Sequence, residues 1–226
     1  MRANPTISVI TATRNCRNTI EQCLASVAAQ TWLDRQHIVV DGASSDGTLE
    51  LLEAHRSQFS VLVSEPDCGI YDALNKGLAY ATGEVVGFLH ADDIYARPDV
   101  LALIAEAFTD PEVGAVYGDV QYVRKDDVSK VVRNWHSGHF SHRRLAWGWM
   151  PPHPSLYVRR SWYARVGAFE TDYRISADYL SVLKLFSQPT LNAVYVPALF
   201  VKMRVGGASN RSIRNMIVKS SEDLNA

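Results

Sequence analysis

The chain has 226 residues, of which 47% are hydrophobic and 21% are charged, and its formal net charge is −1. This length is enough for one full hydrophobic core, and the balanced charge excludes a disordered chain and a protein that binds polyanions through bulk positive charge. We therefore expect one globular domain over residues 1–226 that does not bind nucleic acid.

The N-terminal segment and the cysteines both indicate a reducing compartment. The segment "MRANPTISVITAT" holds no apolar run of signal-peptide length, and no stretch of the sequence approaches the about 18 apolar residues of a membrane span. Cys16, Cys23 and Cys68 are odd in number and show no C-x-x-C spacing, which argues against a disulfide framework or a structural zinc site. We expect a cytoplasmic protein with reduced cysteines.

The first 95 residues alternate short β-branched runs with helical patterns. The runs that predict strands are Ile7–Ala12, His37–Val40, Ser60–Ser64 and Val85–Leu89. The helical patterns cover Thr19–Ala29 after an Asn18 cap, Thr48–Arg56 and Ile70–Ala81. Because these strands are continuously apolar, neither face of the sheet can be exposed to solvent, which predicts a parallel sheet covered on both sides. In such a sheet a ligand crevice is expected at the carboxyl ends of the strands.

The pattern changes after Asp93. A helix is predicted over Asp99–Phe108, and the alternation in Gly114–Val123 and Lys130–Trp135 predicts an antiparallel pair. Further predicted elements are a short helix near Ser161, a helix over Ala177–Phe186, two strands within Asn192–Val201 and a terminal helix after "GGASN". The fold class is therefore α/β, with a mostly parallel central sheet flanked by helices and a small antiparallel subdomain in the second half.

Several polar side chains stand near the predicted crevice. The first turn, "TATRNC", lacks the glycines of a dinucleotide fingerprint or a P-loop, so a nucleotide would be held by side chains and a metal. Asp41 ends the second strand and could accept a hydrogen bond from a base or a ribose, or it could organise the turn. Asp46 is predicted to cap the following helix. Lys76 could meet a phosphate, or it could form a surface ion pair with Asp72 four residues earlier.

The stretch "HADD" runs from an apolar strand into two adjacent carboxylates. Asp92 and Asp93 would repel each other unless a cation compensates them, so they predict a site for Mg²⁺ or Mn²⁺, ions that prefer oxygen ligands. The alternative is one helix cap and one solvated aspartate. Asp178 begins an amphipathic helix, where a carboxylate could be a cap or a functional group.

Together these stretches resemble the family 2 glycosyltransferases with the GT-A fold, in the bacterial branch that makes O-antigen and other cell-surface polysaccharides. The resemblance covers Ile7 to about Ser212 and depends on segments in the correct order, namely "ISVITATRN", "VVDGASSDGT", "SEPDCGIYDALNKGLAYATGEVVGFLHADD", "PPHPSLYVRR", "ISADY" and "GGASN". It implies a single GT-A domain, with residues 1–95 as the nucleotide-sugar-binding half and residues 96–226 as the acceptor-binding half.

The resemblance also implies roles for single residues. The donor sugar nucleotide would be bound by Thr11, Ala12, Thr13, Asn15, Asp41, Lys76, Ala91 and Asp92. Asp92 matches the last carboxylate of the family's D-x-D motif and would hold a divalent metal, Mn²⁺ or Mg²⁺, with Asp93 beside it. Asp178 matches the general base of an inverting transfer. His90 stands where many relatives have the first carboxylate of that motif.

The implied acceptor is a sugar on a polyprenyl diphosphate at the inner membrane face. From Val128 to Phe169 the chain has no acidic residue but is rich in arginine and tryptophan, which suits peripheral contact with an anionic surface or, alternatively, a subdomain with buried tryptophans. Trp149 and His153 could contact acceptor or diphosphate, although His153 could equally be a turn residue. Arg204 could close on the diphosphate from a mobile loop or lie in a plain turn.

Two other functions remain open from the sequence. A metal-dependent nucleotidyltransferase would need the same half that binds the nucleotide, but its usual glycine-rich basic loop is absent from "TATRNCRN". A non-catalytic module that binds nucleotide sugars is the second, and His90 in place of a carboxylate favours it.

Overall fold

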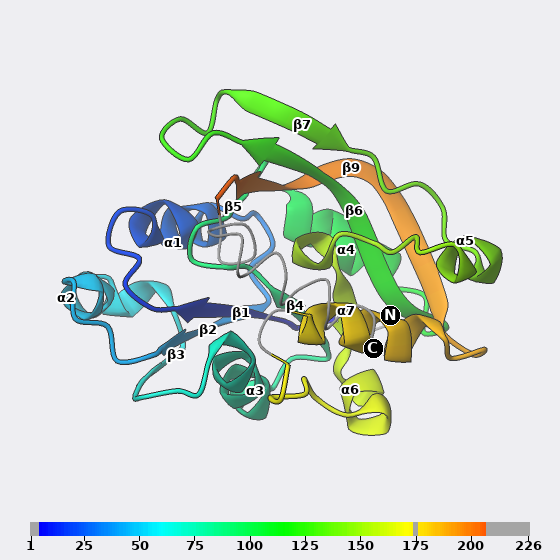
Figure 1. The fold of residues 1–226 in the computed structure, drawn as a ribbon, viewed down its shortest axis with the longest axis horizontal. Coiled ribbons are helices and arrows are strands. Elements are labelled where there is room, and N and C mark those ends of the chain that lie inside the picture. Colours follow the sequence, from blue (N-terminus) through cyan, green and yellow to red (C-terminus); the bar gives the residue numbers. More distant parts are fainter. Residues whose placement is uncertain (1–4, 174–175, 207–226) are drawn as a thin grey trace.

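The computed structural model describes residues 5–173 and 176–206, and its strands form one nine-stranded sheet (Figure 1). The order along the sheet is β3-β2-β1-β4-β8-β6-β9-β5, and β7 pairs with β6. The strands are β1 (Ile7–Thr13), β2 (Arg35–Asp41), β3 (Val61–Ser64), β4 (Val85–Phe88), β5 (Ile94–Tyr95), β6 (Val113–Val123), β7 (Val131–Trp135), β8 (Tyr157–Arg159) and β9 (Asn192–Arg204).

The first half of the sheet is parallel, as the sequence predicts. β1 pairs in parallel with β2 and β4, and β2 pairs in parallel with β3. All seven residues of β1 are buried, because helices cover both faces. The connecting helices are α1 (Ile20–Ala28), α2 (Thr48–Ala54) and α3 (Ile70–Tyr80).

Neither predicted N-cap is confirmed. Asn18 is not the cap of α1, because the residue before the helix is Thr19, which makes no side-chain cap bond. Asp46 is not the N-cap of α2 either, because Gly47 holds that position; Asp46 instead organises the turn before the helix, where its Oδ1 accepts the backbone N–H of Thr48 at 3.0 Å. All three cysteines are free thiols.

The second half joins the first through β8, which is antiparallel to both β4 and β6. The predicted antiparallel pair is confirmed as β6 and β7, and it belongs to the same sheet. The prediction of two strands within Asn192–Val201 is wrong, since β9 is one strand that runs parallel to β6. Its register shifts as it passes Pro197, which has no N–H to give to the ladder.

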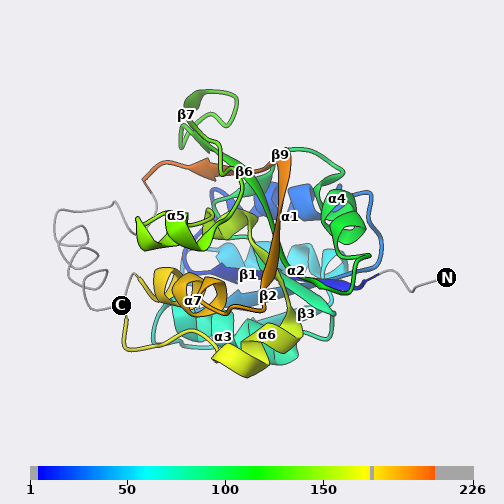
Figure 2. The ribbon, with the colours of Figure 1, turned by 90° about the vertical axis from the view of Figure 1, so that its right-hand side faces the viewer.

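Helices cover both faces of the sheet (Figure 2). α1 and α4 (Val100–Ala107) bury one face, whereas α3, α6 (Arg160–Val166) and α7 (Ala177–Phe186) bury the other. The short helix α5 (His142–Ala146) projects at the edge, and the 3₁₀ turns are η1 (Arg56–Gln58) and η2 (His153–Ser155). The terminal helix predicted after "GGASN" lies outside the described residues. No helix in the described ranges has the length and hydropathy that a membrane span requires.

One close approach fixes the junction of the two halves. A Cβ atom added to Gly87 of β4 would lie 2.1 Å from Cε1 of Tyr157 of β8. The Tyr157 ring can therefore cover the backbone of β4 because no side chain stands there. Behind it, the buried hydroxyls of Tyr95 and Tyr157 share a hydrogen bond.

Candidate active site

A cavity of about 520 Å³ opens at the carboxyl ends of β1 and β4, where the crevice was predicted. Both halves of the chain contribute to it, including residues of α3, of α7 and of the end of β9. Its charged and imidazole side chains include Arg14, Asp67, His90, Asp92, His153 and Asp178. Of the predicted site residues, the cavity is lined by Ala12, Thr13, Ala91, Asp92, Asp93, His153, Asp178 and Arg204. The predicted residues outside its lining are Thr11, Asn15, Asp41, Lys76 and Trp149.

Three buried polar atoms in this lining have no hydrogen-bond partner among the described residues. They are Oγ1 of Thr13, Nδ1 of His90 and Nε of Arg204. A buried polar group without a partner costs about 1–3 kcal/mol, and such groups are rare in folded proteins. Their concentration in one cavity indicates a polar ligand that completes their hydrogen bonds.

The first turn of α7 places Asp178 in the cavity between two donors. Its Oδ1 accepts the hydroxyl of Tyr71 at 2.9 Å, and its Oδ2 lies 3.0 Å from Nδ1 of His153. Burial alone would raise the pKa of Asp178, but the charge and hydrogen bond of His153 and the hydroxyl of Tyr71 outweigh it and lower the pKa to about 2. Asp178 is therefore ionised at neutral pH.

The two carboxylates of "HADD" have different environments. Asp92 is half-buried and faces the cavity. Asp93 is 1% exposed, and its Oδ1 accepts the backbone N–H of Arg204 at 3.3 Å. Burial, with the charge of Asp92 second, raises the pKa of Asp93 well above its ordinary value. Asp93 therefore stabilises the turn through its hydrogen bond with Arg204, and Asp92 is the carboxylate that is more accessible to a ligand.

His90 lies beside His153, with 5.5 Å between the ring centroids. Burial, followed by the charge of His153, lowers the pKa of His90 to about 4, while Asp92 and Asp178 oppose that shift. The position two residues before Asp92 therefore holds a neutral ring. Within the described residues, no group of three or more His, Cys, Asp and Glu side chains is placed to hold a metal.

Arg204 does not lie in a mobile loop, contrary to the expectation from the sequence. It is the last residue of β9, is 5% exposed, and its guanidinium donates to the carbonyl oxygen of Asp92 and to Oε1 of Gln22. Pairing of Arg204 with Val123 of β6 extends the ladder to this point. The side chain is thus fixed beneath the "HADD" turn.

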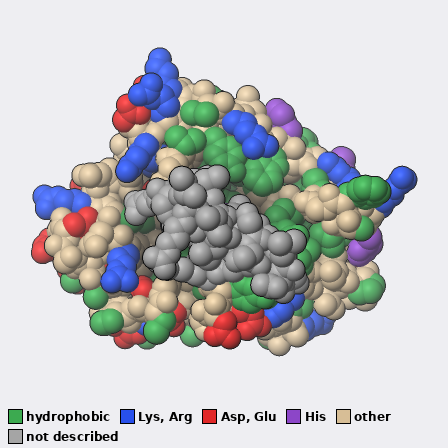
Figure 3. Space-filling model, in the orientation of Figure 1, with side chains coloured by type: hydrophobic (Ala, Val, Ile, Leu, Met, Phe, Trp, Pro, Cys, Tyr) green, Lys and Arg blue, Asp and Glu red, His purple; other side chains and the backbone are tan. Residues whose placement is uncertain are grey.

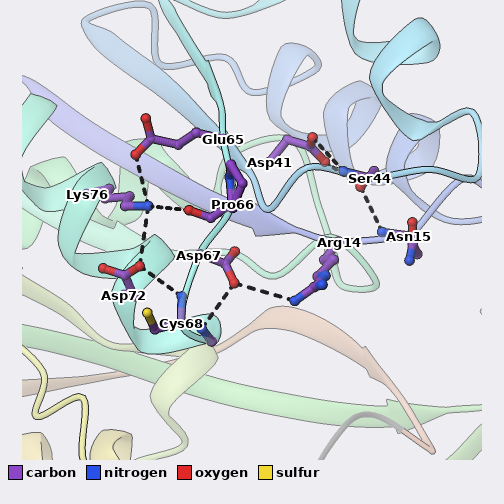
Figure 4. Close-up of polar contacts among 11 residues, drawn as sticks. Arg14, Asn15, Asp41, Ser44, Glu65, Pro66, Asp67, Cys68, Asp72 and Lys76 are labelled. Carbon is purple, nitrogen blue, oxygen red and sulfur yellow. Dashed lines mark hydrogen bonds and ion pairs between the residues drawn. The ribbon is translucent and has the colours of Figure 1, made fainter.

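The residues predicted to hold the base and ribose instead shape the neighbouring loop (Figure 4). Asp41 is fully buried, and its carboxylate accepts the N–H of Ser44 at 3.0 Å and the hydroxyl of Ser64 at 2.8 Å. Asn15 accepts the N–H of Ser45 at 2.9 Å, and the hydroxyl of Thr11 lies 3.0 Å from Nε2 of the His37 ring. In this structure these groups are therefore hydrogen-bonded within the protein, and their predicted role in donor binding stays a prediction.

Lys76 is engaged in the same way. Its Nζ lies 2.9 Å from Glu65 and 3.3 Å from Asp72, and it donates to the carbonyl oxygen of Pro66 at 3.0 Å (Figure 4). The ion-pair alternative is the one that the structure shows. These contacts tie the loop after β3 to α3.

Sequence reasoning missed a second charged pair in the cavity. Nη1 of Arg14 lies 3.8 Å from Oδ1 of Asp67, whose side chain is 5% exposed (Figure 4). Asp67 reaches this position across Gly42, where an added Cβ would lie 2.1 Å from Oδ2 of Asp67. In the sequence, Asp67 is visible only as an acidic residue before a helix, and Tyr71 only as an aromatic residue of a helix.

Trp149 lies outside the cavity and packs into the second half. Its Nε1 donates to the carbonyl oxygen of Ser137 at 2.9 Å, and the guanidinium carbon of Arg144 lies 5.2 Å from its ring centroid. Trp147, in contrast, is 82% exposed. Basic and hydrophobic side chains lie together where Figure 3 shows the edge formed by α5. A shallow hollow there is lined by Arg143, Arg144, Trp147 and Trp149, which we call the α5 patch.

Comparison with solved structures places this cavity in a known fold. A mannosyltransferase from Pyrobaculum calidifontis, solved with GDP-Man and Mn²⁺, aligns with a TM-score of 0.71 and 22% identity over 99% of this chain and 65% of that one. Staphylococcus aureus TarS, solved with UDP-GlcNAc, aligns with a TM-score of 0.70 and 20% identity over 97% of this chain and 67% of that one. The chain thus spans about two thirds of these structures and has the GT-A fold.

Sequence comparison identifies the family. An uncharacterized glycosyltransferase of Mycobacterium tuberculosis is 35% identical over 191 residues, which is 81% of this chain and 70% of the relative. A PGL/p-HBAD biosynthesis glycosyltransferase of Mycobacterium bovis is 31% identical over 222 residues, which is 96% of this chain and 84% of the relative. The family model for glycosyl transferase family 2 matches residues 8–171. The chain belongs to glycosyl transferase family 2, whose members transfer a sugar from a nucleotide sugar.

Proposed function

We propose that this glycosyltransferase moves a sugar from a UDP- or GDP-sugar to a saccharide hydroxyl with inversion at the anomeric carbon. The observation that carries the proposal is the composition of the cavity. It contains unpaired polar atoms of Thr13, His90 and Arg204 and the open carboxylate of Asp92. It also contains the paired carboxylate and imidazole of Asp178 and His153. A polar donor and a hydroxyl acceptor would use these two sets of groups.

A divalent metal fits this chain through Asp92. Mg²⁺ and Mn²⁺ sites in enzymes commonly use one or two carboxylates and take their other ligands from substrate phosphates and water. Asp93 lines the same cavity but is 1% exposed and accepts the backbone N–H of Arg204, so Asp92 is the more accessible of the two carboxylates. When bound, the metal would act as a Lewis acid that compensates the charge of the departing diphosphate.

The reaction itself is a single displacement. The acceptor oxygen attacks the anomeric carbon from the face opposite the diphosphate, and the electron pair of the broken carbon–oxygen bond leaves with the nucleoside diphosphate. The carboxylate of Asp178, which His153 and Tyr71 hold in place, receives the acceptor proton and makes the attacking oxygen a better nucleophile. A product with retained anomeric configuration would contradict this assignment.

For the acceptor we propose a sugar on a polyprenyl diphosphate, in O-antigen-like surface polysaccharide synthesis. Residues 1–95 would bind the donor and residues 96–226 the acceptor. The α5 patch supports contact with an anionic membrane surface, because Arg143 and Arg144 stand beside the exposed Trp147. Arginine and tryptophan together suit the boundary between lipid headgroups and acyl chains.

The experiment is a panel of UDP- and GDP-sugars tested by thermal shift and donor hydrolysis, with Mn²⁺, Mg²⁺ or EDTA. We expect one donor to stabilise the protein in the presence of metal and Asp92→Ala to remove that shift. Asp178→Ala should retain the shift and lose turnover. Asp126→Ala is the control, since Asp126 is exposed and pairs with Arg124 away from the cavity. If donor binding is unchanged both by EDTA and by Asp92→Ala, the assignment of Asp92 is wrong.

A further inference from the structure

An aromatic and basic surface extends from the cavity onto the hairpin of β6 and β7. Tyr122 of β6 lines the cavity together with Met203, its register partner on β9. Arg133 of β7 stands opposite Tyr122 in the ladder, and Trp135 follows two residues later on the same strand. Side chains two residues apart share one face of a strand, so Tyr122, Arg133 and Trp135 lie on one face of the hairpin. We call these three side chains the hairpin platform.

The two rings of the hairpin platform are nearly parallel. Their planes differ by 6° and their centroids lie 6.2 Å apart, and the guanidinium carbon of Arg133 lies 5.8 Å from each centroid. Both rings are half-buried, and Arg133 is exposed. The opposite face of the hairpin is polar, since Gln121 donates to Asn134 at 3.0 Å there. Hydrophobic and basic side chains lie together over this hairpin in Figure 3.

The guanidinium of Arg133 has no acidic partner. Among the described residues it forms neither an ion pair nor a hydrogen bond, whereas Arg124 on the same hairpin pairs with Asp126 at 2.9 Å. A cross-strand aromatic pair alone would only stabilise the hairpin. An unpaired guanidinium beside such a pair, at the border of the cavity, indicates a ligand with both an apolar face and an anionic group.

A sugar ring joined to a phosphate has both of these features. The C–H groups of a pyranose form an apolar face that packs on an aromatic ring, while its hydroxyls remain free for polar contacts. Phosphate oxygens accept charge-assisted hydrogen bonds from a guanidinium. A neutral saccharide would use only the rings, and inorganic phosphate would use only the guanidinium.

We infer that the hairpin platform binds a glycosyl phosphate unit of the acceptor, with the sugar ring on Tyr122 and Trp135 and the phosphate at Arg133. This inference rests on the proposed function, because a polyprenyl-diphosphate sugar contains such a unit. Tyr122 lines the same cavity as Asp178, so an acceptor on the platform extends toward the site of the reaction. The platform therefore acts in acceptor binding and not in the chemical step.

The chain supplies a matched control in α6. The guanidinium carbon of Arg165 lies 4.9 Å from the ring centroid of Trp162, so this pair has the same chemistry as Arg133 and Trp135. Trp162 is only 7% exposed, however, and neither Arg165 nor Trp162 lines the cavity. Arg165→Met should therefore change neither binding nor kinetics.

Ligand-observed NMR titration of the full chain tests the platform without turnover. The probes are glucosyl, galactosyl, mannosyl and N-acetylglucosaminyl phosphates, the corresponding methyl glycosides, and inorganic phosphate. We expect one glycosyl phosphate to bind about tenfold more tightly than its methyl glycoside, because only the phosphate has a partner in Arg133. Arg133→Met should remove that difference, and Trp135→Leu should weaken binding about threefold or more. Asp92→Ala should leave it unchanged, since Asp92 belongs to the proposed donor site.

Three results overturn the inference. One is a glycosyl phosphate that binds Arg133→Met as tightly as the wild type. Another is inorganic phosphate that binds as tightly as every glycosyl phosphate, which would indicate an adventitious ion only. The third is binding that Asp92→Ala abolishes and Arg133→Met retains, which would place the probe in the donor site. Arg133→Met keeps an apolar stem beside both rings, so an unchanged Tm confirms that its loss of binding is not unfolding.

The kinetic readout separates this inference from the proposed function. With a polyprenyl-diphosphate sugar as acceptor, Arg133→Met and Trp135→Leu should raise the acceptor KM several-fold and leave kcat and the donor KM near their wild-type values. A fall in kcat with an unchanged acceptor KM would contradict a role in binding. If no nucleotide sugar is turned over but glycosyl phosphate binding depends on Arg133, the proposed function fails while the hairpin platform stands.

Discussion

The guanidinium of Arg204 donates a hydrogen bond to the backbone carbonyl oxygen of Asp92, so the end of the last strand supports the turn that presents the open carboxylate. The same residue also gives its backbone N–H to Asp93 at 3.3 Å. One arginine thus contacts both aspartates of this turn, of which Asp92 is the more exposed and Asp93 the more buried.

Replacing Arg204 should affect both stability and donor binding. Arg204→Met keeps the bulk of the side chain but leaves the carbonyl of Asp92 and the amide oxygen of Gln22 without their donor. Gln22 is exposed and can bond water instead, so the cost comes mainly from the lost hydrogen bond to the Asp92 carbonyl and amounts to about 1–3 kcal/mol, which urea unfolding would measure. Metal-dependent nucleotide affinity should also fall. Affinity that stays at the wild-type value would show that the turn holds its shape without the arginine.

Gly87→Ala should destabilise the junction of β4 and β8. The added methyl would overlap the ring of Tyr157, which is fully buried and cannot swing into solvent. Overpacking of this kind costs about 1–3 kcal/mol. In a Tyr157→Leu background the same substitution should cost less, and the difference in urea midpoints gives the coupling. Equal costs in both backgrounds would place the strain elsewhere.

Acid should destabilise the protein through His37 well before the carboxylates titrate. Burial, with the charge of Arg35 second, lowers the pKa of His37 from 6.5 to about 3. The folded state keeps the ring neutral while the unfolded state takes up a proton below pH 6.5, so stability falls as the pH drops from 6.5 toward 3. The slope from this group approaches about 1.4 kcal/mol per pH unit.

Urea unfolding between pH 8 and pH 4.5 measures this slope, and His37→Met should reduce it. The range above pH 7.5 is the internal reference, because the ring is neutral there in both states. A variant with the full wild-type slope would assign the acid sensitivity to other groups.

The α5 patch should bind anionic vesicles at low salt. Each arginine near such a surface contributes about 1 kcal/mol, so Arg143→Glu with Arg144→Glu should weaken binding more than tenfold in a sedimentation assay. Arg124→Glu is the matched control, since Arg124 is exposed on the β6–β7 connection and already paired with Asp126. The membrane proposal falls if the wild type stays in the supernatant at low salt.

Local patterns were enough to predict most elements. The helix Ala177–Phe186 has the predicted bounds, because its apolar spacing and first-turn Asp178 both act within a few residues. β1 to β4 could be predicted for a similar reason, since strands buried on both faces carry continuous apolar runs. The crevice at their carboxyl ends follows from the parallel topology, and the cavity lies there.

The failures depend on partners that are distant in sequence. The sequence does not show that Asp41 accepts a hydrogen bond from Ser64 of β3, 23 residues away. Arg204 looked like a loop residue because its strand is fixed by pairing with β6 and because its acceptor, Asp92, lies 112 residues earlier. No local pattern records such contacts. For the same reason, the pairing of His153 with Asp178 could not be found before the fold was known.

The placement of β8 limits how parts of this enzyme can be exchanged with those of its relatives. β8 belongs to the second half of the chain but hydrogen-bonds to β4 of the first half, directly after the η2 turn that carries His153. A chimera joined at residue 95 would therefore insert a foreign strand into the middle of the sheet and a foreign imidazole into the cavity. Recombination would have to transfer residues 153–159 together with the strand they border, so the two halves do not form independent modules.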